Sequence, residues 1–287
     1  MSRPAPVVGG AIGVFDSGIG GLSVLHHIRE QLPREDLIYF ADQGHVPYGS
    51  RSVVEIRTFS VAIANFLIAR GAKVIVVACN TASAAALTFL RDNIPEVPIV
   101  GMEPAVKPAA GHTRTGKIGV LATPGTFDSA RYAGLLVQYA GEISVFEDPC
   151  RGLVELIEQG QFYGPEVERI LHEATGPMLT AGIDTLVLAC THYPFVLPVI
   201  RQLVGPEMAI IDPAPAVARQ TWRVLQRDLP FSSGKDTGQV QIITSGDAKK
   251  LASIASQLLE TEFSVNQAFW REDHELPLTT DLDGNRQ

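Results

Sequence analysis

The hydrophobic residues of this chain form short continuous runs that alternate with longer segments of helical periodicity. The runs are rich in valine, isoleucine and leucine, whereas the segments between them repeat apolar residues at every third or fourth position. Strands that are apolar on both faces are typical of parallel sheets with helices on either side. The pattern therefore predicts an α/β fold. The expected strands are 11–16, 36–41, 73–79, 97–101, 117–123, 142–148, 185–190, 208–212 and 240–244, and the expected helices include 22–31, 52–70, 82–93, 127–140, 166–181 and 247–260.

The alternation also repeats within the chain. IGVFDSG at 12–18 is echoed by IGVLATPG at 118–125, and VVACNTA at 76–82 is echoed by VLACTHY at 187–193. Two similar Rossmann-like domains with mainly parallel sheets, facing one another across a central cleft, explain the echo. Two unrelated halves of the same general fold are the alternative. We expect a first domain of residues 1–102 plus 213–265, a second of residues 103–212, and a flexible tail of residues 266–287.

The composition narrows the range of possible partners. The net charge is −8 and no cluster of lysine and arginine stands out, which argues against a nucleic-acid surface. No apolar segment reaches the length of a membrane span, and the N-terminal stretch lacks the features of a signal peptide. Three cysteines in 287 residues form neither a disulfide framework nor a zinc-binding set. We therefore expect a cytoplasmic protein with no nucleic-acid or membrane partner and no metal site.

Several polar residues stand where predicted strands end. Ligands of open parallel sheets bind beyond the carboxyl ends of the strands, next to helix N-termini. Asp16, Cys79, Thr123 and Cys190 all occupy such positions. If the two domains face each other, these four residues share one cleft.

The two strand-end cysteines occupy matching positions in the two halves. Each precedes an expected helix, with Thr81 as the expected N-cap of the first and Pro194 in the first turn of the second. A helix N-terminus lowers the pKa of a thiol and attracts carboxylates. One such cysteine alone is more often a core residue, but two in matching settings favour chemistry. Cys150 has no counterpart and is expected to be structural.

Two thiols in one cleft suggest redox exchange, nucleophilic catalysis or proton transfer from two sides. Redox pairs are usually close in sequence, as in CxxC, and no such motif occurs. A single nucleophile would leave the second cysteine unexplained. Proton transfer uses both, because inversion of a carbon requires a base on one face and an acid on the other.

The remaining polar candidates are less specific. The turn FDSGIGG carries Asp16 and Ser17, but Ser23 stands where a dinucleotide-binding fingerprint has its third glycine. The turn at 46–50 could be an ordinary connection. His192, two residues after Cys190, is a candidate acid/base partner, whereas a carboxylate such as Glu155 could equally be a solvated helix residue.

The motifs DSGIGGLSV, PYG, VVACNTAS and LACTHYP, in this order, closely resemble those of glutamate racemases, within the cofactor-independent aspartate/glutamate racemase group. The resemblance extends from about residue 11 to 262. It implies interconversion of L- and D-glutamate without pyridoxal phosphate, any other cofactor or metal, supplying D-glutamate for peptidoglycan. It also implies a small-molecule partner, glutamate, and a homodimer, since members of the family are often dimers.

The resemblance also implies residue roles. Cys79 would take the α-proton of the D-enantiomer with support from Asp16, and Cys190 that of the L-enantiomer with support from His192 and Glu155. Asp42 matches an auxiliary acidic position. The substrate-binding residues would be Asp16, Ser17, Tyr48, Gly49, Ser50, Asn80, Thr81, Thr123, Thr191 and His192.

The chain departs from the family pattern at Gln43, Gly44 and His45, where members often have Thr-Ala-Arg, and it lacks the common segment around Cys150. His192 favours glutamate as the substrate, because aspartate racemases of the group usually have a glutamic acid residue at that position. Two alternatives stay open at this point. One is racemisation of a related substrate such as aspartate or a hydantoin, and the other is an amino-acid-binding protein without catalytic activity.

Overall fold

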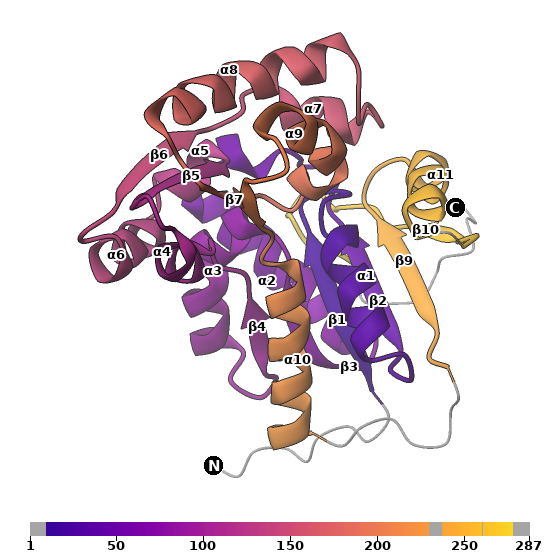
Figure 1. The fold of residues 1–287 in the computed structure, drawn as a ribbon. Helices are drawn as coiled ribbons and strands as arrows, with labels where there is room; N and C mark the ends of the chain where they lie inside the picture. The colour runs from indigo at the N-terminus through magenta and orange to yellow at the C-terminus, as the bar shows by residue number, and fades with distance from the viewer. Residues whose placement is uncertain (1–9, 230–236, 260, 278–287) are drawn as a thin grey trace.

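The chain forms two β-sheets, each with helices on both faces (Figure 1). The structure, a computed structural model, describes residues 10–229, 237–259 and 261–277. All strand pairs within these residues are parallel, which confirms the expected α/β fold. In spatial order, the first sheet contains β10 (Val265–Gln267), β9 (Val240–Thr244), β2 (Leu37–Ala41), β1 (Ala11–Asp16), β3 (Ala72–Val77) and β4 (Ile99–Gly101). The second contains β6 (Ser144–Asp148), β5 (Lys117–Ala122), β7 (Thr185–Ala189) and β8 (Ala209–Ile211).

The internal echo in the sequence corresponds to a repeated topology. The order β2-β1-β3-β4 in the first sheet is the same as the order β6-β5-β7-β8 in the second. Strand β1 thus matches β5, and β3 matches β7. Because Cys79 follows β3 and Cys190 follows β7, the two thiols hold the same place in the two sheets.

Helices cover both sheets and carry the local signals that helices require. Ser52 and Glu55 form a capping box at the start of α2 (Val53–Ala69). Helix α8 (Pro165–Ala181) begins with a proline and is followed by Gly182 in the left-handed conformation. The helices beside the first sheet are α1 (Leu22–Gln31), α2 (Val53–Ala69), α3 (Asn80–Asn93), α10 (Ala214–Asp228) and α11 (Ala248–Leu259). Those of the second are α4 (Val106–His112), α5 (Pro124–Phe127), α6 (Ala130–Tyr139), α7 (Leu153–Glu158), α8 (Pro165–Ala181) and α9 (Leu197–Val204), and short 3-10 turns lie at Tyr48–Ser50 and Tyr193–Val196.

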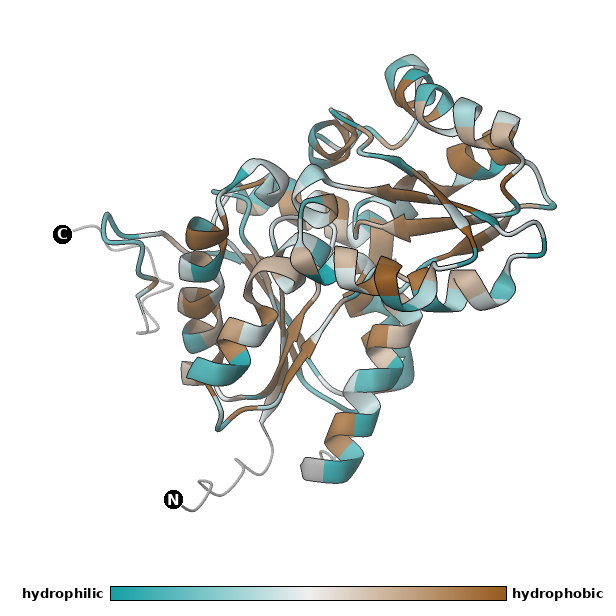
Figure 2. Cartoon of the chain, turned by 90° about the vertical axis from the view of Figure 1, so that its left-hand side faces the viewer, coloured by the Kyte–Doolittle hydropathy of each residue, from teal (hydrophilic) through white to brown (hydrophobic). Residues whose placement is uncertain are grey.

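The core explains the unbroken apolar runs. Every residue of β1, β2, β3 and β7 is buried, because helices pack against both faces of each sheet. Hydropathy colouring shows these strands as hydrophobic segments enclosed by helices of mixed character (Figure 2). One core cluster contains residues of both domains, including Ile19 from the first and Val154 and Cys190 from the second. In the part of the chain that the structure describes, no helix is long and apolar enough to cross a bilayer.

The C-terminal segment differs from the expected flexible tail. Residues Val265–Gln267 form β10, which pairs with β9, and both Ala268 and Leu276 are buried against the first domain. The segment was missed because a three-residue edge strand is too short to show periodicity, and the surrounding sequence is acidic. Residues 278–287 of the expected tail lie outside the described residues.

Candidate active site

Cys79 lies at the junction of a strand and a helix in the first domain. The residue is 5% exposed and is itself the N-cap of α3, where its Sγ accepts the N–H of Ala82 at 3.4 Å. The expectation that Thr81 would be the cap is therefore wrong, because α3 begins at Asn80, two residues before the expected start at Ala82. Sγ also lies 3.8 Å from the hydroxyl of Ser17. The sulfur thus occupies the positive end of a helix dipole.

Cys190 occupies the matching place in the second domain but has different neighbours. Its Sγ lies 3.7 Å from Nδ1 of His192, and the other ring nitrogen, Nε2, lies 2.7 Å from Oε1 of Glu158. All three side chains are at least nine-tenths buried. A thiol, an imidazole and a carboxylate therefore form a chain of contacts away from solvent. Such a chain orients the imidazole and stabilises its charged form.

The carboxylate beside His192 belongs to Glu158, not to Glu155 as the family pattern suggested. Helix α7 buries Leu153, Val154, Ile157 and Glu158, while Glu155 on its other face is exposed. The burial follows helical spacing, in which residues three and four positions apart share a face. The apolar positions of LVELIE thus carried a signal that could have favoured Glu158. Glu158 also accepts hydrogen bonds from Nε2 of Gln43 at 2.9 Å and from the backbone N–H of Ile19 at 2.7 Å.

The glycine-rich turn at 17–21 contacts this same group across the domain interface. A Cβ at Gly18 would lie 1.8 Å from Oε1 of Glu158, and a Cβ at Gly20 would lie 2.4 Å from Oγ1 of Thr191 and 2.6 Å from Nδ1 of His192. A side chain at either position would force the facing side chains of Glu158, Thr191 and His192 to shift. The glycines therefore permit the close approach of the two domains.

Asp16 is the last residue of β1, and its carboxylate forms hydrogen bonds with residues of both domains. Its Oδ1 accepts the N–H of Gly18 at 2.9 Å, and its Oδ2 accepts the hydroxyl of Thr191 at 3.0 Å. Complete burial raises the pKa of Asp16 above its ordinary value. The charge of Asp16 also raises the pKa of the Cys79 thiol. Asp16 therefore lies near the reacting groups, although it does not line the cavity.

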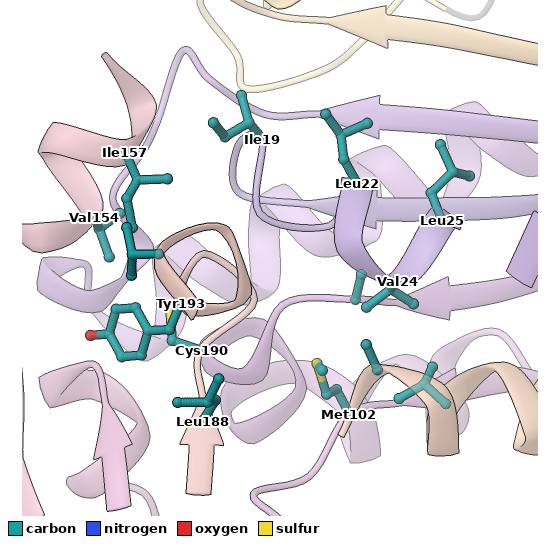
Figure 3. Close-up of a cluster of buried hydrophobic side chains, with 14 of the residues drawn as sticks. Ile19, Leu22, Val24, Leu25, Met102, Val154, Ile157, Leu188, Cys190 and Tyr193 are labelled. Carbon is teal, nitrogen blue, oxygen red and sulfur yellow. The ribbon is translucent and has the colours of Figure 1, made fainter. Parts of the chain in front are cut away.

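Both thiols line one small cavity between the domains. The volume open to the centre of a water molecule is about 10 Å³, the space of about one water molecule. In Figure 3, Val154 and Ile157 of α7 lie near Cys190 and Tyr193 on this side of the interface. The cavity is lined by Ser17, Pro47, Tyr48, Gly49, Cys79, Asn80, Thr81, Thr123, Val154, Cys190, Thr191 and His192.

The structure thus brings together most of the residues expected at the site. Three expected residues do not line the cavity: Asp16 is buried next to it, and Ser50 and Glu155 line an outer hollow of about 210 Å³ beyond Pro47 and Val154. The closed cavity is too small for an amino acid, so entry of a ligand requires an opening of its walls. Pro47 and Val154 were not expected at the site, because neither carries chemistry that a sequence motif would mark.

The cavity wall carries polar groups suited to an amino acid. Oδ1 of Asn80 is buried and has no hydrogen-bond partner among the described residues. The hydroxyls of Thr81, Thr123 and Thr126 lie within 3.4 Å of one another and join α3 to α5 across the interface. Buried polar atoms are normally satisfied, so a free acceptor beside this hydroxyl cluster favours a polar ligand.

The two thiols differ in their electrostatic surroundings. Burial, together with the charge of Asp16, raises the pKa of Cys79 to about 12. Burial alone would lower the pKa of His192, but the hydrogen bonds with Cys190 and Glu158 raise it well above the ordinary value of 6.5. The hydrogen bond from His192 likewise lowers the pKa of Glu158, against the effect of its burial. At neutral pH, Cys79 is thus a neutral thiol, and the ring of His192, whose pKa is raised, lies beside the sulfur of Cys190.

The family model described as Asp/Glu/Hydantoin racemase matches residues 12–221. The chain belongs to this family. Among its relatives, the glutamate racemase of Pseudomonas aeruginosa is 55% identical over 225 residues, which make up 78% of this chain and 85% of that protein. The glutamate racemase of Ectopseudomonas mendocina is 48% identical over 256 residues, or 89% of this chain and 97% of that protein.

Solved structures of the racemase family share the fold. The glutamate racemase of Francisella tularensis in complex with D-glutamate has a TM-score of 0.79 and 30% identity, covering 92% of this chain and 98% of that one. The Escherichia coli glutamate racemase, in complex with L-glutamate and the activator UDP-MurNAc-ala, has a TM-score of 0.79 and 32% identity, covering 90% and 97%. The chain is therefore an α/β racemase with the two-sheet architecture of these enzymes.

Proposed function

We propose that this racemase interconverts L- and D-glutamate, with Cys79 and Cys190 as the two acid/base groups. The observation that carries the proposal is that both thiols line the same cavity at matching ends of two repeated sheets. Inversion of Cα needs a proton acceptor on one face and a proton donor on the other. The repeat supplies one thiol from each side. No cofactor is part of this reaction.

From L-glutamate, the Cys190 thiolate removes the α-proton while the Cys79 thiol donates its proton to the opposite face. The C–H bond on one face breaks as a C–H bond on the other face forms, and the charge moves from one sulfur to the other. From D-glutamate, the roles are reversed. The raised pKa of Cys79 supports its role as the proton donor in this direction.

Positioned donors lower the barrier by stabilising the carbanion-like transition state more than the substrate. The N-terminus of α3 and the hydroxyls of Thr81, Thr123 and Thr191 provide such donors for the substrate carboxylates. The free Oδ1 of Asn80 is placed to accept a hydrogen bond from the α-ammonium group. Closure of the two domains over the substrate excludes water, which keeps the transferred proton between substrate and sulfur.

Glutamate is the proposed substrate rather than aspartate or a hydantoin. The relatives reported above are glutamate racemases, and two of the solved structures hold D- or L-glutamate. His192 stands at the position where the sequence pattern favoured glutamate. The role that follows is supply of D-glutamate for peptidoglycan in the cytoplasm, and a homodimer stays a prediction from the family resemblance.

The test is incubation of the purified protein with L-glutamate in D₂O without added cofactor. Circular dichroism follows inversion, and proton NMR follows exchange at Cα. We expect both to occur, and we expect aspartate to react far more slowly. Turnover of aspartate but not glutamate would contradict the substrate assignment. Glutamate binding without exchange or inversion would instead indicate a non-catalytic binding protein.

A further inference from the structure

Asp42 is a fully buried carboxylate one residue beyond the end of β2, and it lies outside the cavity. Its backbone N–H donates to the carbonyl of Asp16 at 2.9 Å, which joins it to the strand end that carries the catalytic site. A buried carboxylate is stable only when donors surround it. The identity of these donors shows what the residue does.

Four side chains donate hydrogen bonds to Asp42. Oδ1 accepts from Oγ of Ser245 at 2.6 Å and from Nε1 of Trp270 at 2.7 Å. Oδ2 accepts from the hydroxyl of Tyr48 at 2.6 Å and lies 3.0 Å from Nδ1 of His45. The donors come from the loop after β2, from the end of β9 and from the C-terminal segment. The Asp42 carboxylate thus links three separate segments of the chain by hydrogen bonds.

The aromatic residues around this carboxylate hold the C-terminal segment in place. The imidazole of His45 stacks on Phe59 of α2 with ring centroids 3.9 Å apart, and the Trp270 ring meets His45 edge-on at 4.9 Å. The position of His45 is one at which this chain departs from the usual family residue. Trp270 therefore packs into a pocket that the particular sequence of this loop creates.

Tyr48 connects the carboxylate to the substrate cavity. Pro47, Tyr48 and Gly49 line the cavity, and the Tyr48 side chain is 1% exposed. Its hydroxyl is directed at Oδ2 of Asp42 and so is already engaged. The orientation of the turn therefore depends on the orientation of the carboxylate. Trp270 and Ser245, both on Oδ1, fix the plane of that carboxylate.

We propose that the C-terminal segment positions the cavity-lining turn through Asp42, and that Trp270 is a positioning residue for substrate binding. The inference rests on the proposed function, because it assigns the turn to glutamate. Trp270 does not touch the cavity and acts through the Asp42 carboxylate and the Tyr48 hydroxyl. The segment 265–277 is thus a part of the active-site framework that is remote in sequence from every motif.

The test compares Trp270→Phe, which keeps an aromatic ring but removes the N–H donor, with Phe269→Leu at the exposed neighbouring position. We expect Trp270→Phe to raise KM for both enantiomers about tenfold, since one donor to a charged acceptor is lost, with a smaller change in kcat. Phe269→Leu should leave both constants unchanged. In the double variant with Tyr48→Phe, KM should be no higher than in Tyr48→Phe alone, because both changes break the same path.

A lower Tm with unchanged KM in Trp270→Phe would overturn the proposal, and so would full additivity of the two changes. If Trp270→Phe does not fold, Ser245→Ala removes the other donor to the same oxygen and carries the same expectation. A readout without catalysis is the rate at which iodoacetamide alkylates Cys79, measured by peptide mass spectrometry. We expect faster alkylation when the turn is loosened. An inactive wild-type protein would refute the proposed function alone, because the alkylation rates would still test the positioning role.

Discussion

The two domains carry their thiols at the same place in the same topology, yet they surround them differently. Cys79 has a helix N-terminus, the hydroxyl of Ser17 and the charge of Asp16 nearby. Cys190 has the His192–Glu158 pair. The repeated fold thus places the two sulfurs at matching positions, and the divergent neighbours give them different electrostatic surroundings.

The difference between the two sites has a mechanistic reason. A two-base reaction cannot start from two thiols or from two thiolates, because one group has to accept a proton while the other donates. Two identical surroundings would favour neither thiol as the base. An imidazole of raised pKa beside Cys190 and a carboxylate near Cys79 make the two surroundings unequal.

The largest expected effect comes from removing either thiol. Cys79→Ala and Cys190→Ala should each lower kcat/KM by about 10³-fold or more, because each removes an acid/base group that no other side chain replaces. Racemase assays by circular dichroism, started from each pure enantiomer, measure this loss. Cys150→Ala is the control and should stay within about twofold of wild type, because Cys150 is buried but does not line the cavity. Full activity in either of the first two variants would refute the two-thiol mechanism.

The next largest effect distinguishes the two glutamates of α7, Glu158 and Glu155. Glu158→Gln should lower kcat/KM by about 10²-fold, since the His192 cation loses its partner, whereas Glu155→Gln on the exposed face should change it little. The equilibrium constant of a racemisation is one, so kcat/KM must fall equally for both enantiomers. The asymmetry should appear in the isotope effect, which should grow more for α-deuterated L-glutamate than for the D-form. The opposite ranking of the two variants would restore Glu155 as the functional residue.

A smaller loss of activity is expected from adding a methyl group where the two domains are in close contact. Gly20→Ala places a methyl group against Thr191 and His192, which should raise KM and lower kcat/KM by about tenfold if the domains shift by less than an ångström. Gly111→Ala in α4 is the matched control, because a Cβ there meets nothing within 4 Å. Equal activity of the two variants would show that the domains need not approach closely for catalysis.

The sequence allowed the architecture and most of the cavity to be predicted. The buried strands were visible as continuous apolar runs, and the cysteine motifs marked the ends of β3 and β7. These signals are local, because a strand buried on both faces has to be apolar along its whole length. The family resemblance, and not these local signals, named Ser17, Asn80 and Thr191 as site residues, and all three line the cavity with the thiols.

Contacts between distant segments could not be predicted in this way. Glu158 is 34 residues away from His192 in sequence, and only the packing of α7 selects it over Glu155. Thr81 had the chemistry of an N-cap, but the helix starts two residues earlier than expected and uses the sulfur of Cys79. Trp270 lies beyond a three-residue strand in an acidic stretch, so nothing nearby indicated its contact with Asp42.

The smallest effect concerns stability and its dependence on pH. The pKa of Glu158 is lowered in the folded protein, so its contribution is present above the ordinary value of 4.5 and is lost as the pH falls through the folded value. The pKa of His192 is raised, so its contribution is complete below 6.5 and is lost as the pH rises through the folded value. The ion pair therefore stabilises the protein most between these two limits.

Urea unfolding of wild type and Glu158→Gln at several pH values measures this contribution. Near pH 6, we expect the variant to be less stable by about 1–3 kcal/mol, the cost of losing a buried hydrogen bond between charged groups. The difference should shrink as the pH falls below 4.5 and through the lowered pKa of folded Glu158. It should also shrink at pH values well above 6.5, where His192 loses its proton. A difference that is constant with pH would show that the substitution acts through packing, and the charge asymmetry between the two thiol sites would then need another source.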